Sequence, residues 1–114
     1  MTVLFLITGF AYAQDSIEAA KIQFLISTVE NLKEAKFVRN GKAYDSKKAA
    51  NHLRHKLMAA GDRVKTADDF IRLCASKSSL SGKPYLIRFS DGVIMEAEVF
   101  FRNRLNGFSD KTIP

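Results

Sequence analysis

The sequence predicts a small single α+β domain with about four helices and a short antiparallel sheet or hairpins. Three stretches repeat apolar residues at helical spacing, and one stretch alternates apolar and polar residues as a strand does. The dipeptides Asn40-Gly41 and Asp91-Gly92 are typical of tight turns. The chain has 114 residues, 46% of them hydrophobic, which suffices for one modest core and not for two.

The N-terminus, MTVLFLITGFAYA, differs from the rest of the chain. An apolar stretch from Val3 to Phe10 precedes Ala11-Tyr12-Ala13, a pattern typical of a signal-peptide cleavage site, although no Lys or Arg stands before it. The stretch is shorter than the roughly 20 apolar residues that span a bilayer. We therefore expect a signal peptide over 1–13 that is cleaved, a domain over 14–114 without a transmembrane segment, and a periplasmic or secreted location.

The first expected helix covers residues 15–35, DSIEAAKIQFLISTVENLKEA. It contains no Gly or Pro, its apolar side chains recur at helical spacing, and Asp15 or Ser16 suits the N-cap. The segment KFVRNGKAY follows. Its Asn40-Gly41 pair suits a two-residue type I′ turn because both residues tolerate positive φ, so we expect a hairpin here.

Two more helices are expected after the hairpin. DSKKAANHLRHKLMAAG has capping residues at its start and a stop at Gly61. Its basic residues fall on the side opposite an apolar stripe. That stripe consists of Ala49, Leu53, Leu57 and Ala60. TADDFIRLCAS starts at Thr66, with Asp69 placed to complete a capping box. Its apolar stripe includes Cys74, the only cysteine, so an intramolecular disulfide is impossible.

The C-terminal part of the chain combines a strand with an ambiguous segment. KPYLIRF alternates as a half-buried strand does, and Asp91-Gly92 supplies a turn after it. Residues 93–101 fit both strand alternation and a helical stripe. We expect a short strand to about Met95 and a helix over about 97–106, ended by Gly107.

The net charge of +6 is concentrated in one part of the chain. Between Lys36 and Lys56, seven basic residues stand against a single acid, Asp45. Such an excess favours anionic partners, such as phospholipid head groups or acidic and phosphorylated glycans, although it also suits a solvated helix face. No nucleic-acid-binding motif is present, and we expect no nucleic-acid partner.

The sequence assigns no catalytic residue, metal ligand or cofactor. His52 and His55 lie three residues apart on one helix, but zinc needs a third ligand and no H-E-x-x-H pattern is present. The serine-rich segment contains none of the motifs of a nucleotide P-loop or a serine hydrolase.

The segment SKSSLSGKPY, residues 76–85, admits two interpretations. Its hydroxyls and flexible backbone, beside Lys77 and Lys83, suit hydrogen bonds to a phosphate or carboxylate. It also suits a plain connection from a helix into a strand that begins near Pro84. Together with the basic excess, it supplies our candidate ligand-binding residues: Arg39, Asn40, Lys47, Lys48, Arg54, His55, Ser78, Ser79, Ser81, Gly82 and Tyr85.

Four segments, FVRNGKAY, ANHLRHK, DDFIRLCASKSSLSGKPYLIRF and DG, carry a resemblance. They resemble a family of small exported bacterial proteins known only as a domain of unknown function. The resemblance spans nearly the whole chain after the signal peptide, and it implies export and a compact α+β fold without implying an activity. Phe100-Phe101 stands where similar proteins often carry Trp-Leu. The motif positions are Phe37, Arg39, Asn40, Gly41, Tyr44, His52, Leu53, Lys56, Phe70, Ser76, Ser78, Ser79, Ser81, Gly82, Pro84 and Tyr85.

We interpret the chain as an exported binding module for an anionic ligand or an envelope protein, and other function classes stay open. One alternative is a hydrolase-like enzyme that uses His52 or His55 as base with a serine of the 76–85 segment. Another is a periplasmic inhibitor of a cell-wall hydrolase, because Ser81 to Tyr85 form an S-G-x-x-Y pattern similar to the loop of bacterial lysozyme inhibitors, which are β-barrels. A third is a structural partner in the cell envelope.

Overall fold

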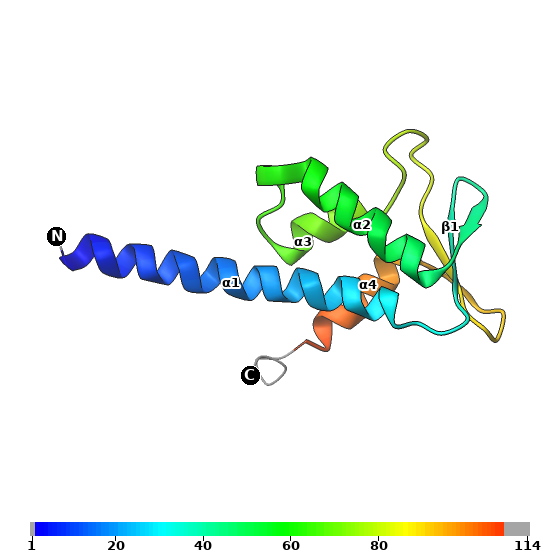
Figure 1. Ribbon diagram of the computed structural model, residues 1–114, viewed down its shortest axis with the longest axis horizontal. Coiled ribbons are helices and arrows are strands. Elements are labelled where there is room, and N and C mark those ends of the chain that lie inside the picture. Colours follow the sequence, from blue (N-terminus) through cyan, green and yellow to red (C-terminus); the bar gives the residue numbers. More distant parts are fainter. Residues whose placement is uncertain (1, 109–114) are drawn as a thin grey trace.

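A long N-terminal helix and a small body around its C-terminal half make up the computed structural model (Figure 1). The structure describes residues 2–108, with side chains from residue 15 onward. Residue 1 and residues 109–114, the outer ends of the predicted signal peptide and domain, lie outside the described residues. The elements are α1 (Thr2–Glu30), β1 (Lys36–Arg39), β2 (Lys42–Tyr44), α2 (Ser46–Ala60), η1 (Gly61–Arg63), α3 (Ala67–Phe70), η2 (Ile71–Ala75), β3 (Leu86–Arg88), β4 (Ile94–Glu96) and α4 (Ala97–Asn106).

The four strands form one antiparallel sheet in the order β2-β1-β3-β4, which confirms the predicted α+β class. The β1–β2 hairpin turns at Asn40 and Gly41, whose φ angles are 53° and 79°. Both angles are positive, as a type I′ turn requires, so the predicted hairpin is confirmed. β3 pairs with β1 on one side and with β4 on the other, and Gly92 (φ 90°) lies in the turn between β3 and β4.

The first helix differs from its predicted bounds at both ends. It begins at Thr2, so Asp15 and Ser16 lie inside the helix and the predicted N-cap there is wrong. It ends at Glu30 rather than at residue 35, because the chain turns through Glu34 at φ 57° and pairs in β1 from Lys36. The N-terminal half of α1 extends beyond the body (Figure 1). Within residues 2–108, no helix combines the length and apolar character needed to cross a membrane.

The two middle helices begin at the predicted caps. Asp45 accepts a hydrogen bond of 2.8 Å from the backbone N–H of Lys48, and Gly61 ends α2 at φ 54°. Thr66 and Asp69 form the predicted capping box of α3, whose continuation η2 is a π-helical turn. Of the stripe predicted for α2, two side chains are buried and two are half-buried. The buried pair is Leu53 and Ala60, and the half-buried pair is Ala49 and Leu57.

The core lies where α1, α2, α3 with η2, α4 and the sheet meet. Its fully buried side chains include Leu25, Phe70, Ile87 and Phe101, and Cys74 is buried among them as predicted. The ambiguous C-terminal segment divides as expected into β4 and α4, and Gly107 caps the end of α4.

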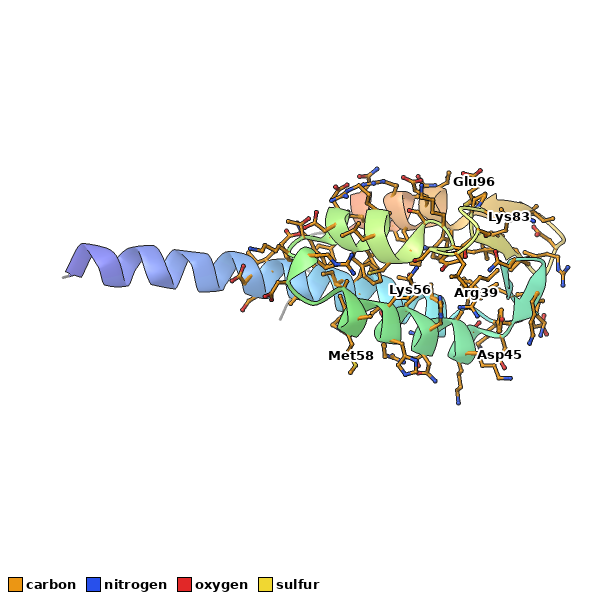
Figure 2. The ribbon with its side chains drawn as sticks, turned by 90° about the horizontal axis from the view of Figure 1, so that it is seen from above. Arg39, Asp45, Lys56, Met58, Lys83 and Glu96 are labelled. Carbon is orange, nitrogen blue, oxygen red and sulfur yellow. The ribbon has the colours of Figure 1, made fainter. Side chains whose placement is uncertain are left out.

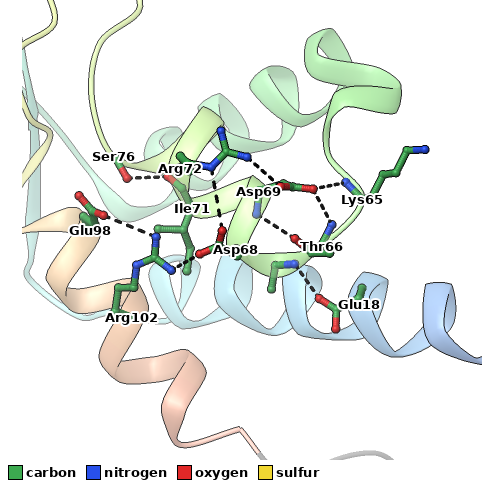
Figure 3. A network of polar contacts seen from close by, with 11 residues as sticks. Glu18, Lys65, Thr66, Asp68, Asp69, Ile71, Arg72, Ser76, Glu98 and Arg102 are labelled. Atoms are coloured by element: carbon green, nitrogen blue, oxygen red, sulfur yellow. Dashed lines mark hydrogen bonds and ion pairs between the residues drawn. The ribbon is translucent and has the colours of Figure 1, made fainter.

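A polar network on the surface joins three helices around the start of α3 (Figure 3). The Glu18 carboxylate of α1 accepts a hydrogen bond of 2.8 Å from the backbone N–H of Ala67. Asp68 forms an ion pair with Arg102 of α4. Arg102 Nη2 also lies 3.6 Å from Glu98 Oε2. Glu18 sits at the positive end of α3, where a carboxylate stabilises a helix. The network therefore fixes α1 and α4 against α3.

Candidate functional site

Arg39 is placed by the β1–β2 hairpin and held by an aromatic neighbour. The turn at Asn40 returns the chain so that Phe37 of β1 pairs with Tyr44 of β2. Because side chains alternate along a strand, Arg39 and Phe37 lie on the same face of the sheet as Tyr44. The Arg39 guanidinium donates a hydrogen bond of 3.2 Å to the Tyr44 hydroxyl and lies 5.2 Å from the centre of that ring. These two contacts with Tyr44 fix the plane of the guanidinium.

His52 of α2 meets the same guanidinium. Arg39 Nη1 lies 2.9 Å from His52 Nδ1 and 3.1 Å from Nε2, so a ring nitrogen without a proton accepts from Arg39. Burial, together with the positive charges of Arg39 and Lys56 and the neighbouring His55, lowers the pKa of His52 to about 4. The imidazole is therefore neutral at pH 7, and it does not add a second positive charge beside Arg39.

Tyr85, the residue before β3, continues this polar chain. Its hydroxyl lies 3.4 Å from His52 Nε2 and accepts a hydrogen bond of 3.2 Å from Lys56 Nζ. Lys56 also donates to the Ser79 hydroxyl at 3.1 Å. Arg39 and Lys56 both point inward between α2 and the rest of the body, whereas Met58 points away (Figure 2). We call this set the Arg39 network: Tyr44, Arg39, His52, Tyr85, Lys56 and Ser79.

A pocket of about 270 Å³ opens beside the Arg39 network. Its apolar lining includes Phe37, Leu53 and Phe101, and its polar lining includes Arg39, His52 and Tyr85. None of the fourteen described residues that line it is acidic, and two, Arg39 and Lys48, carry a full positive charge. Among the described residues, Arg39 forms no ion pair with a carboxylate. The pocket therefore joins an apolar wall to a positive charge that no carboxylate of the described chain balances.

The structure brings four of the predicted site residues together at the pocket. Arg39, Lys48, His55 and Tyr85 all line it. Lys47 is exposed on α2 outside this lining. Arg54 instead binds both oxygens of Glu30 on α1, at 2.7 and 3.2 Å, so its guanidinium joins α2 to α1.

The predicted residues of the 76–85 segment mostly bond to one another and to the hairpin. Ser78 Oγ accepts hydrogen bonds from Asn40 Nδ2 and from the backbone N–H groups of Leu80 and Ser81, and Ser81 Oγ donates to Asn40 Oδ1. Gly82 supplies a turn at φ 72°. These contacts fasten the segment to the tip of the β1–β2 hairpin, so the interpretation as a structural connection explains most of its serines.

His52, Tyr44 and Lys56 belong to the site although the candidate list omits them. Lys48, His52 and Lys56 are four residues apart on α2, a spacing that places all three on one helix face. That four-residue spacing is the sequence signal that could have identified His52 and Lys56 as site residues. Within the described residues, no group of three His, Cys, Asp or Glu side chains lies close enough to hold a metal.

The arrangement suits anion binding better than proton transfer or target insertion. An imidazole with a pKa of about 4 is a weak base at neutral pH, and its nitrogens contact Arg39 and Tyr85 rather than a serine hydroxyl. The tyrosine of the S-G-x-x-Y pattern is buried against His52, whereas Leu80, at the exposed end of the loop, is 96% exposed. The loop therefore does not present Tyr85 to a partner protein.

The comparisons with known proteins agree with the resemblance noted in the sequence. The model of a family of unknown function (DUF5329) matches residues 16–109. The chain is 40% identical over 84 residues to the uncharacterized protein YfeK of Salmonella typhimurium (strain LT2). The aligned residues make up 73% of this chain and 70% of that protein. A comparison with solved structures found no match.

Proposed function

Because the chain belongs to the DUF5329 family of unknown function, we propose a role from its own geometry: it is a binding module that holds a small anionic ligand in the pocket beside Arg39. Export is part of the proposal. It rests on the apolar stretch from Val3 to Phe10 and the Ala11-Tyr12-Ala13 pattern after it.

The charge state of the Arg39 network carries the proposal. A half-buried guanidinium is normally paired with a carboxylate, because removing a charge from water is costly unless an opposite charge replaces the lost hydration. Arg39 instead contacts a neutral imidazole and a phenol, and its pocket contains no acid among the described residues. A hydrogen bond to a charged group contributes about 1.5–3 kcal/mol. A bound anion would supply that contribution.

A thermal-shift experiment on the intact chain tests the proposal. Anions of several classes, namely hexanoate, glycerol phosphate, glucose 6-phosphate and inorganic phosphate, are each added at low and high salt. A ligand at 100 times its Kd adds about 2.7 kcal/mol, which raises the Tm of a domain this small by roughly ten degrees. We expect a rise that high salt weakens, because part of the attraction is electrostatic.

Two matched variants locate the effect. Arg39→Gln removes the pocket charge, and Arg88→Gln removes the same charge from an exposed position of β3 outside the pocket lining. The ligand-induced rise in Tm should disappear in Arg39→Gln and persist in Arg88→Gln. Equal rises in both variants, or no rise with any anion, would contradict the proposal.

The enzyme alternative makes a separate prediction. A hydrolase-like site with a serine nucleophile predicts covalent labelling of a serine in the 76–85 segment by a fluorophosphonate. We expect no such labelling, because the His52 nitrogens contact Arg39 and Tyr85 rather than a serine hydroxyl. Labelling at any of these serines would favour the enzyme.

A further inference from the structure

We propose that the ligand of this pocket is a small monocarboxylate with an apolar body. Its carboxylate would bind the Arg39 guanidinium and its body would lie against the apolar lining. This inference rests on the proposed function and specifies the chemistry of the ligand. Three features carry it: the number of fixed charges, the character of the wall and the size of the pocket.

A single fixed cation faces the pocket. Arg39 is held by His52 on Nη1 and by Tyr44 on Nη2, and each of these nitrogens keeps a second N–H. A guanidinium held in one plane matches the two oxygens of a carboxylate. A carboxylate carries one negative charge, which Arg39 balances alone. A phosphate monoester carries nearly two, and the other charged lining residue, Lys48, is an exposed side chain on the first turn of α2.

The buried part of the wall offers little to a polar ligand, because the lining residues Lys48, Asn51 and His55 are exposed. Half of the fourteen lining residues have apolar side chains, among them Phe37, Leu53, Ala97 and Phe101. Among the described residues, every buried side-chain nitrogen or oxygen already has a hydrogen-bond partner. A sugar or a nucleoside would bury hydroxyls against this apolar part of the wall, which is unfavourable. An apolar body loses nothing by entering such a wall and gains from leaving water.

The volume limits the ligand to a small molecule. At about 270 Å³ the pocket lies just below the roughly 300–1,000 Å³ that is common for ligand sites. Each methylene group buried in an apolar pocket improves affinity by about fourfold, so affinity should rise along a series of carboxylates until the pocket is full.

Isothermal titration calorimetry on the intact chain tests the inference with paired probes. Butyrate, hexanoate and octanoate are compared with hexanamide, which keeps the shape of hexanoate and loses its charge, and with glycerol phosphate, which has the charge without the apolar body. We expect affinity to rise from butyrate to hexanoate. We expect hexanamide to bind at least about tenfold more weakly than hexanoate, because one charge-assisted contact corresponds to about that factor.

Variants assign the carboxylate to Arg39. Arg39→Gln should lower the affinity for hexanoate to that for hexanamide, and Arg88→Gln should leave both unchanged. The comparison of acid with amide in the unaltered chain is decisive even where Arg39→Gln fails to fold. Equal affinities for acid and amide, or no gain from butyrate to hexanoate, would overturn the inference.

The outcomes separate this inference from the proposed function. If glycerol phosphate binds through Arg39 and the carboxylates do not, the pocket is an anion site and the inference about the apolar body is wrong. If neither class binds, both the inference and the proposed function fail.

Discussion

The neutral state of His52 predicts that the chain loses stability in mildly acidic solution. In the unfolded chain the imidazole takes up a proton near pH 6.5, whereas in the folded chain its pKa is lowered to about 4. Between these values the unfolded state binds more protons than the folded state, so acidification favours unfolding. The free energy of unfolding should therefore fall as the pH drops from about 6.5 toward 4, with no further loss from this group below 4.

The size of the effect follows from the difference between the two pKa values. Each pKa unit corresponds to about 1.4 kcal/mol, so the full difference would give about 3 kcal/mol. The ring is only half-buried and solvent screens its neighbours, which reduces the expected loss between pH 7 and pH 5 to about 1–2 kcal/mol. The pKa values of Glu18, Glu30 and Asp69 are themselves lowered, so these carboxylates stay ionised in this window and their stabilising contacts are lost only in more acidic solution.

Urea unfolding at pH 7, 6, 5.5 and 5 measures the effect. The control is His52→Gln, whose amide oxygen can still accept from Arg39 but does not titrate. The unaltered chain should lose about 1–2 kcal/mol over this range, and the variant should lose much less. Parallel pH profiles for the two proteins would show that the loss comes from groups other than His52.

Three further predictions concern the structure around the site. Asn40→Gly keeps the positive φ and removes the contacts with the two loop serines, so it should lower the free energy of unfolding in urea by about 1 kcal/mol. Asn40→Ala should lower it by about 1 kcal/mol more, because alanine resists a positive φ. Equal losses in the two variants would contradict the role given to the turn. Glu18→Gln should lower the free energy of unfolding by about 1 kcal/mol at pH 7, because the carboxylate that accepts from the Ala67 N–H at the start of α3 loses its charge. An unchanged Tm would show that this contact does not stabilise the fold. Burial raises the pKa of Cys74, so a thiol reagent should modify it only as fast as the protein opens, and rapid labelling in native buffer would show that its surroundings are not closed.

The local elements were largely predictable because short signals determine them. Asn40-Gly41 predicts the hairpin, and Thr66 with Asp69 predicts the start of α3. The end of α1 was not predictable in this way. The sequence after Glu30 suits a helix, but the pairing of β1 with β3 decides its conformation. β3 lies about 50 residues further along the chain than β1. The central position of β1 in the sheet likewise depends on contacts between distant segments.

The candidate site was only partly predictable, for a similar reason. The basic excess identifies Arg39 and Lys48, which line the pocket, but it also selects Arg54, which is bound to Glu30 of α1. A helical wheel of α2 alone does not show that partner. The serines of the 76–85 segment suggested a ligand loop, yet Ser78 and Ser81 bind Asn40 at the hairpin tip. Which polar groups are already satisfied is a property of the fold rather than of any one segment.

A map of backbone amide chemical shifts, recorded for the intact chain with and without hexanoate, tests most directly whether the pocket beside Arg39 binds a carboxylate. We expect the largest changes at Arg39, Tyr44, His52 and Tyr85, and much smaller changes at the same positions with hexanamide. Changes confined to the exposed basic residues Lys47 and Lys83, or spread evenly over the surface, would contradict the claim that the pocket beside Arg39 is the binding site.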